Sequence, residues 1–411
     1  MTMILKKSNK SLQNSLNDML LDLDEDNTIT NSAYIQARAK LNWTAFREYF
    51  DLSVNSFYSD GDFSKFKGFR LLAVDGSIVI LPNSLDIKQE FNPTIAKCQI
   101  KEYEKEVIQA RVSCLYDVIN NIVIDASINN KINSKDNTLK AYGERALAFK
   151  HLEYCTKEDL VIFDRGYPSY ELFAKYSKKS NFICRVKKTS FKGAKALFNP
   201  HSEHKDIIVD ITAPKAIKSS LKKSKLPTKM KIRFIQVILD NATVEVLATN
   251  VLKHNILEYN DFKELYAKRW GIESYYNLIK NRLSLENFTG KSALSIKQDF
   301  YSTLFLTNFE ALLTYELNQE LKEKKSDNRY EQKINKAVSF NLIKMKLFDL
   351  LYKDTPLDTT LQKIEKLLIQ NTIAIRPNRK TKARLDKERQ KSTIANNSIN
   401  HLKRKKKNVG N

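Results

Sequence analysis

The sequence predicts an α/β fold in which helices pack around a mixed sheet. From about residue 63 the chain first reads as strands, over 69–75, 107–117 and 122–128. A helix over roughly 137–156, a strand ending at Asp164, a helix from Pro168 and a strand over 181–186 follow. Strands that come first and then alternate with helices are typical of a mixed sheet covered by helices. The length of 411 residues indicates two or more domains.

Residues 1–62 are expected to form an N-terminal helical module. After a possible cap at Thr30-Asn31-Ser32, apolar residues recur at spacings of 3, 4 and 4, which is the repeat of one helix face: Tyr34, Ala37, Leu41 and Ala45. Basic side chains flank this stripe at Arg38, Lys40 and Arg47. From the residues alone, a helical appendage packed on the core explains the pattern.

The core is expected in two parts, residues 63–189 and 248–352, on either side of a β-rich insertion over 190–247. The 108 residues between Asp164 and Glu273 are more than one helix and one strand require. Within them, Ile207–Ile211 and Ile232–Leu239 alternate like strands. The Lys- and Ser-rich stretch 215–231 is interpreted either as a solvated turn or as a loop that binds along a polyanion. Two long amphipathic helices are expected near 294–323 and 331–352.

The C-terminal region, residues 353–411, is the most basic part of the chain. Residues 376–411 carry 13 Lys and Arg and 2 acidic residues, a net +11 of the formal +23 for the whole chain. Such blocks bind phosphates without reading sequence. The final 20 residues or so, which include Lys403–Lys407, are expected to be disordered without DNA.

The composition restricts the class of protein. A charge of +23 implies a polyanionic partner, and without an apolar run of 18 residues or a signal-peptide core, nucleic acid is a simpler partner than a membrane. No Walker-type loop indicates nucleotide hydrolysis. Isolated cysteines are expected to be buried thiols in a reducing cytoplasm: Cys98, Cys114, Cys155 and Cys184. His201 and His204 lie in a polar loop without cysteine partners, which disfavours a metal pair there.

Two short apolar runs end in an aspartate. Phe69–Val74 leads into Asp75-Gly76-Ser77, and Leu160–Phe163 leads into Asp164-Arg165-Gly166-Tyr167. Each reads as a buried strand whose carboxyl end delivers a carboxylate into a turn, where ligands gather in α/β sheets. Either aspartate alone is explained equally well as a turn former or a helix cap.

A third segment places four polar side chains on one helix face. Tyr266, Arg269, Glu273 and Lys280 lie at offsets 0, 3, 7 and 14. At 100° per residue they project within about 60° of one another on an α-helix. A carboxylate among an arginine, a lysine and a phenol suits a site where a metal meets a phosphodiester. The stripe taken alone is also consistent with a solvated helix face.

Together these segments resemble the DDE transposases of bacterial insertion sequences. The spacing Tyr-x2-Arg-x3-Glu-x6-Lys matches the signature of one subgroup, insertion sequence family four, without departure. Further similar segments surround it: Val74–Ser77, Asp164–Tyr167, Glu245–Asn250, Phe288–Lys291 and Gln298–Tyr301. The resemblance covers roughly residues 30–380.

The resemblance implies an RNase H-like core and a two-metal reaction. It assigns Asp75, Asp164 and Glu273 as catalytic residues that hold two Mg²⁺ ions, with Mn²⁺ as an alternative, and Tyr266, Arg269, Lys280 and Arg165 as phosphate-binding residues. It implies double-stranded DNA as partner, at the element ends and the target, and a homodimer in the synaptic complex. The N-terminal module would help to grip the element's DNA end.

The sequence is compatible with three functions. An active transposase is favoured by the complete set of three carboxylates. The alternatives are a catalytically idle DNA-binding protein derived from a transposase, and a standalone RNase H-like nuclease. Some relatives cut through a DNA hairpin and stack a tryptophan of the insertion on a flipped base. Here Trp43 and Trp270 both lie outside the insertion, and Phe234 is expected to be buried, so a hairpin route is not indicated.

Overall fold

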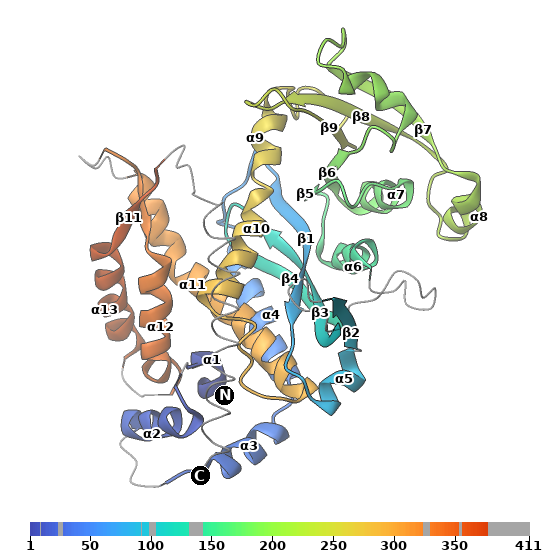
Figure 1. Cartoon of the computed structure of the whole chain (residues 1–411). Helices are drawn as coiled ribbons and strands as arrows, with labels where there is room; N and C mark the ends of the chain where they lie inside the picture. The colour runs from blue at the N-terminus through green and yellow to red at the C-terminus, as the bar shows by residue number, and fades with distance from the viewer. Residues whose placement is uncertain are drawn as a thin grey trace.

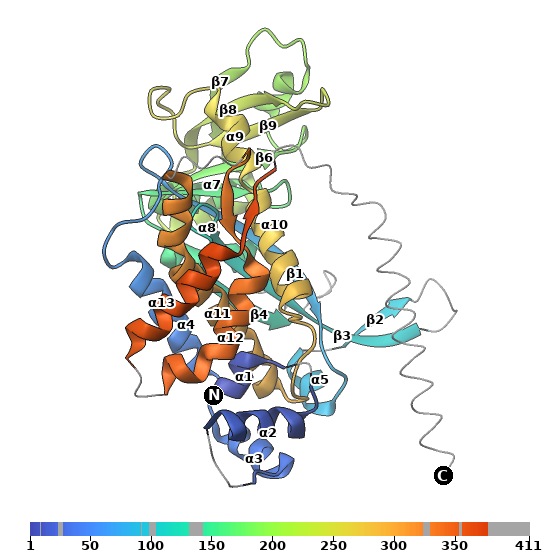
Figure 2. The same ribbon diagram turned by 90° about the vertical axis from the view of Figure 1, so that its left-hand side faces the viewer.

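The computed structural model describes residues 1–8, 10–23, 28–91, 93–97, 104–130, 143–323, 329–352 and 356–376. The basic tail from residue 377, Cys98 and the first part of the helix expected over 137–156 lie outside these residues. In two views at 90°, the N-terminal helices α2 and α3 lie at one end of the molecule and strands β7–β9 lie at the other (Figures 1 and 2).

One large mixed sheet organises the fold. Among the described residues it has nine strands, in the order β2-β3-β1-β5-β6-β9-β8-β7, with β4 also paired to β3. The central strands are β1 (Arg70–Ile80), β3 (Glu104–Asp117), β4 (Ile122–Asn130), β5 (Asp159–Phe163) and β6 (Asn181–Val186), with β2 (Pro93–Lys97) at the edge. Three antiparallel strands, β4-β3-β1, are followed by β5 and β6, which are parallel to β1. This is the strand order of an RNase H-like core, so the predicted fold class is confirmed.

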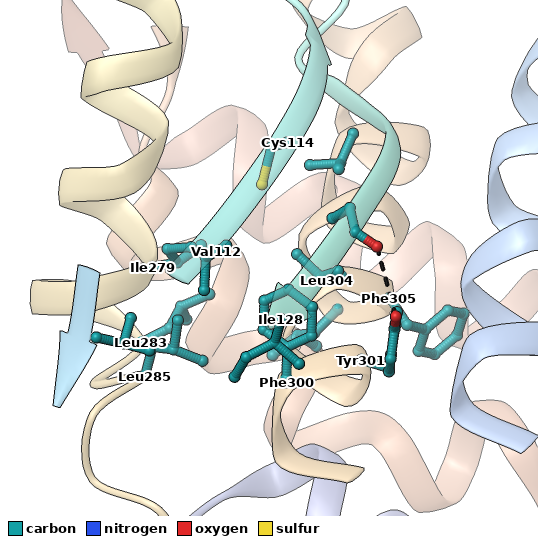
Figure 3. Packing of buried hydrophobic residues seen from close by; sticks show 14 of the residues in the cluster. Val112, Cys114, Ile128, Ile279, Leu283, Leu285, Phe300, Tyr301, Leu304 and Phe305 are labelled. Carbon is teal, nitrogen blue, oxygen red and sulfur yellow. Dashed lines mark hydrogen bonds between the residues drawn. The ribbon is translucent and has the colours of Figure 1, made fainter. Parts of the chain in front are cut away.

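Helices cover both faces of the central strands, which explains why their sequences are continuously apolar. Residues Leu71–Val74 and Leu160–Phe163 are almost completely buried. One face packs on α10 (Trp270–Asn277) and α11 (Ala293–Glu323), where Val112 and Cys114 meet Phe300 and Leu304 (Figure 3). The other face packs on α6 (Glu144–His151) and α7 (Tyr170–Lys179). Short helices α5 (Leu85–Phe91) and Leu152–Tyr154 link these elements.

The β-rich segment extends the same sheet. Strands β7 (Asp206–Thr212), β8 (Lys229–Ile238) and β9 (Val244–Thr249) are antiparallel, and β9 pairs with β6. A turn of 3-10 helix over Lys192–Phe198 precedes β7, and α8 (Lys215–Lys223) occupies much of the stretch read as a loop over 215–231. Phe234 is fully buried in β8, as expected.

The N-terminal helices do not form the continuous stripe expected from the sequence. The chain forms α1 (Thr2–Lys6), α2 (Leu12–Leu23), α3 (Asn31–Lys40) and α4 (Thr44–Tyr58), so the predicted helix face is divided between α3 and α4. α3 has no buried residue, whereas α4 packs across α11 and β4. Two of the basic residues that flank the predicted helix face are bound within the protein: Arg38 of α3 pairs with Asp299 at 2.8 Å, and Arg47 of α4 pairs with Asp125 at 3.0 Å.

The C-terminal part consists of helices beside α11. After the 31-residue α11, the chain forms β10 (Gln332–Ile334), α12 (Lys336–Leu351), α13 (Leu357–Gln370) and β11 (Thr372–Ala374), and β10 pairs with β11. The second amphipathic helix is therefore shorter than the 331–352 predicted, because a short strand precedes it. No helix within the described ranges is long and apolar enough to cross a membrane.

Candidate active site

The register of two parallel strands brings Asp75 and Asp164 to neighbouring positions. Val74 of β1 is paired with Phe163 of β5, and each aspartate is the next residue of its strand or turn. The two aspartates, separated by 88 residues of sequence, are therefore neighbours at the carboxyl end of β5. Asp164 enters a turn after β5, as predicted, but the turn predicted after Asp75 is wrong, because β1 stays paired with β3 and continues to Ile80. This is the edge of an α/β sheet at which ligands commonly bind.

The Asp75 carboxylate lies in an environment that disfavours its charge. Burial raises its pKa to about 6, and the nearby Glu273 and Glu144 act in the same direction. The Gly76 N–H donates a hydrogen bond to Asp75 Oδ1 at 2.8 Å, and this bond and Arg269 oppose the shift. Asp75 is thus a carboxylate whose negative charge is incompletely balanced by the protein.

The Asp164 carboxylate is held in its charged form. Burial alone would raise its pKa, but the Arg165 N–H, the Tyr266 hydroxyl and the nearby arginines lower it below the ordinary value. The Tyr266 hydroxyl donates to Asp164 Oδ1 at 2.9 Å, and Arg185 Nη1 of β6 lies 3.8 Å from the same oxygen. The two aspartates therefore differ in charge balance although they are neighbours.

The four signature residues do not lie on one straight helix. Tyr266 is in α9 (Asp261–Ala267), Arg269 in the turn before α10, Glu273 in α10, and Lys280 in a π-helical turn over Leu278–Arg282. The ammonium group of Lys280 donates to the Ile78 carbonyl of β1. The side chains remain on the side of the helix that faces β1 and β5, but the π-helical turn shifts Lys280 from the angle predicted by α-helical spacing.

Arg269 lies among all three carboxylates. Its Nη1 atom is 2.7 Å from Glu273 Oε1, and its charge also lowers the pKa of Asp75 and of Asp164. The side chain is 4% exposed and its Nε atom has no hydrogen-bond partner within the described structure. The guanidinium is therefore the central cation of the site in this conformation.

Residues 67–309 match the Transposase DDE domain family. The chain belongs to the DDE transposase family. No curated protein matches it. Among solved structures, it is similar to a piggyBac transposase synaptic complex with hairpin DNA, at 11% sequence identity and a TM-score of 0.44, over 94% of this chain and 79% of that one.

The three carboxylates of the transposase offer the hard oxygen donors that Mg²⁺ prefers. Their chemistry fits a divalent cation, and burial together with the nearby Glu273 and Glu144 raises the pKa of Asp75. In the part of the chain that the structure describes, however, no three His, Cys, Asp or Glu side chains are placed to hold a metal together. Glu273 is instead bonded to Arg269, so the expected closure of three acidic residues on one cation is not present in this conformation.

The residues expected to bind phosphate differ in accessibility. Tyr266 and Arg269 are 5% and 4% exposed and are bonded to Asp164 and Glu273, Lys280 is half-buried, and Arg165 is exposed. Trp270 is 59% exposed, and the Arg269 guanidinium lies 4.7 Å from its ring centroid. The ring of Trp270 is therefore not packed in the core.

The segments beside the signature that also resemble the family hold neighbouring elements together and do not line the site. Glu245 binds Arg185 at 2.9 Å, Asn250 ties β9 to Phe182 and Ser180, and Gln298 bonds Arg38. His201 and His204 are exposed, and Cys114, Cys155 and Cys184 are buried free thiols.

Sequence reasoning missed Arg185 and Glu144. Arg185 stands in an apolar strand, where a lone charge is a usable signal. Glu144 has no local signal, because its relation to the aspartates depends on the tertiary fold.

Proposed function

We propose that the chain is a transposase that binds the terminal inverted repeats of an insertion sequence and catalyses Mg²⁺-dependent cleavage and strand transfer of DNA. The observation that supports this proposal is the placement of Asp75, within β1, beside Asp164, which directly follows the paired strand β5, with Glu273 on α10 and Arg269 close to all three carboxylates. The assignment to the subgroup of insertion sequence family four rests on the signature spacing.

Asp75, Asp164 and Glu273 would hold the metal. A pair of Mg²⁺ ions at such a site activates the attacking oxygen and stabilises the leaving oxygen of a phosphodiester. Glu273 must first leave Arg269, since the two are bonded in the present conformation. The freed guanidinium then offers a planar donor pair to a DNA phosphate, which lysine at this position would not reproduce.

The remaining donors would position the DNA. Arg165 is exposed beside Asp164 and can meet a phosphate directly. Lys280 donates one N–H to the Ile78 carbonyl and has further N–H donors for a phosphate, whereas Tyr266 has a single hydroxyl proton and must release Asp164 to donate to a phosphate. The formal charge of +23 supports a polyanionic substrate. Synapsis of two element ends supports a homodimer at the working stage, in the cytoplasm of the host cell.

The test uses purified full-length protein, Mg²⁺ and a plasmid that carries the element's ends. Wild type should cleave at those ends, while Asp75→Asn, Asp164→Asn and Glu273→Gln should each lose cleavage by at least about 1000-fold and retain end binding. Asp240→Asn is a matched control, because Asp240 is exposed between β8 and β9 and pairs with the exposed Lys263. Retained turnover in an active-site variant removes that residue from the site.

The same assay separates the competing functions. A DNA-binding protein without catalysis would retard the end-containing fragment and never nick it. A standalone nuclease would cut plasmids with and without the ends at equal rates. Either result would replace the transposase proposal.

A further inference from the structure

Glu144 lies beside the strand residue that follows Asp75 and beside the turn that follows Asp164. It is the first residue of α6. A Cβ atom added to Gly76 would lie 3.4 Å from Glu144 Cγ, and one added to Gly166 would lie 3.6 Å from Glu144 Oε2. Gly76 directly follows Asp75, and Gly166 is two residues after Asp164. The side chain of Glu144 therefore spans the backbones that present both aspartates.

The environment of Glu144 repeats that of Glu273. Arg111 Nη1 lies 2.7 Å from Glu144 Oε1, the same separation as between Arg269 and Glu273. The two glutamate side chains are 45% and 41% exposed. Both arginines have a buried Nε atom without a partner among the described residues. Each glutamate is thus a partly exposed carboxylate that is neutralised by one arginine.

The hydroxyl of Tyr167 is buried near Asp75 and Glu144 without a hydrogen-bond partner among the described residues. Tyr167 is 1% exposed, and its hydroxyl has no hydrogen-bond partner among the residues that the structure describes. Burial raises the pKa of Tyr167, and the charges of Asp75 and Glu144 raise it further, which places the phenol in the field of these two carboxylates. A buried hydroxyl without a hydrogen-bond partner destabilises the folded protein, and a bound water is the usual partner. A hydrated cation would supply such a water.

Solvent reaches Glu144 through a large cleft. The cleft has a volume of about 1250 Å³ and lies between α6, the Asp164 turn and the insertion. Its lining includes Arg111, Glu144 and Gly166. An ion in this cleft can therefore reach the Glu144 carboxylate.

We propose that Glu144 is a fourth acidic residue of the cation site, which leaves Arg111 and gives a carboxylate oxygen to the divalent ion held by Asp75. The inference rests on the proposed function, because it concerns the same metal. A fourth carboxylate matches the chemistry, since hard divalent cations are bound by several oxygen ligands from one site. It also gives Asp75 a partner from the helix that covers the opposite face of the sheet from α10.

The test is Mn²⁺ binding to the full chain without DNA, followed by electron paramagnetic resonance. Glu144→Gln keeps an acceptor for Arg111 and removes only the charge, so it should weaken Mn²⁺ binding about 10-fold or more. Glu171→Gln is the matched control, because Glu171 lines the same cleft but is engaged by Lys175 at 2.8 Å. The Mg²⁺ concentration for half-maximal cleavage should rise by a similar factor in Glu144→Gln alone.

The variant Asp75→Asn distinguishes failure of the Glu144 inference from failure of the proposed metal site. If Asp75→Asn weakens Mn²⁺ binding and Glu144→Gln does not, Glu144 is not a ligand and the inference is wrong. If neither variant changes Mn²⁺ binding, the proposed metal site fails and the inference fails with it. If Glu144→Gln does not fold, Arg111→Met replaces it: release of Glu144 should strengthen Mn²⁺ binding several-fold, and unchanged binding would overturn the inference.

Discussion

Arg269 Nη1 lies 2.7 Å from Glu273 Oε1, so the conformation described here has an arginine bonded to one of the carboxylates expected to bind metal. The same guanidinium lowers the pKa of both Asp75 and Asp164. Like charges close together in a partly buried site repel strongly, and one cation among three carboxylates reduces that repulsion. On the proposed function, Arg269 would therefore compete with a divalent cation for Glu273 before binding a DNA phosphate.

Arg269→Met should change metal binding and cleavage in opposite directions. Loss of the guanidinium frees Glu273 and removes a positive charge, so Mn²⁺ affinity of the free protein should rise several-fold. Cleavage of end-containing DNA should fall at least about 100-fold, because the phosphate donor is lost. Lys268→Met is the control, since Lys268 pairs with Glu264 on the adjacent turn. An Arg269→Met variant with wild-type Mn²⁺ affinity would show that Arg269 does not restrain Glu273.

Asp75→Asn should stabilise the metal-free protein at neutral pH. The pKa of Asp75 is raised to about 6 in the folded chain, above its value near 4 in an unfolded chain. Between these two pH values the folded state binds more protons than the unfolded state. Ionisation of Asp75 therefore destabilises the fold, and this destabilisation is complete above pH 6 and absent below about pH 4. The substitution should raise the free energy of unfolding by about 2 kcal/mol at pH 7.5, in EDTA, and by nothing near pH 4.

Asp164→Asn provides an internal control of opposite sign. The pKa of Asp164 is lowered in the folded chain, so its charge contributes stability above its unfolded pKa, and this stability is lost as pH falls through the folded value. Thermal unfolding at pH 7.5 should therefore begin at a lower temperature than in wild type. Two substitutions that both destabilise, or both stabilise, at this pH would contradict the opposite charge balance of the two aspartates.

Trp270 should report the arrival of DNA at the site. It is 59% exposed and lies beside Arg269, whereas Trp43 stacks on Tyr301 with ring centroids 5.1 Å apart. In a Trp43→Phe variant Trp270 is the only tryptophan, and DNA containing the element end should quench its fluorescence. Trp270→Ala should weaken DNA binding about 5- to 100-fold, the range of one base-stacking contact. Fluorescence that is unchanged at saturating DNA would place the DNA away from α10.

The local content of the site follows from the sequence. Short apolar runs before Asp75 and Asp164 identify buried strands, because only burial on both faces explains such continuous hydrophobicity. The separation of four residues between Arg269 and Glu273 predicts neighbours on a helix, and the two side chains are bonded. The order of strands and helices predicts a mixed α/β sheet, since each element has its own periodicity, whereas the RNase H-like core was implied by the family resemblance.

The relations between distant residues were decided by tertiary structure. The pairing of β1 with β5 sets Asp75 beside Asp164, and the packing of α6 sets Glu144 against Gly76 and Gly166. Neither relation leaves a mark in local sequence, since strand register and helix docking depend on the whole core. The same reason explains why Arg38 and Arg47, which flank an apparent apolar stripe, bind Asp299 and Asp125. The sequence determined which groups are available to the site, and the three-dimensional packing determined which of them share it.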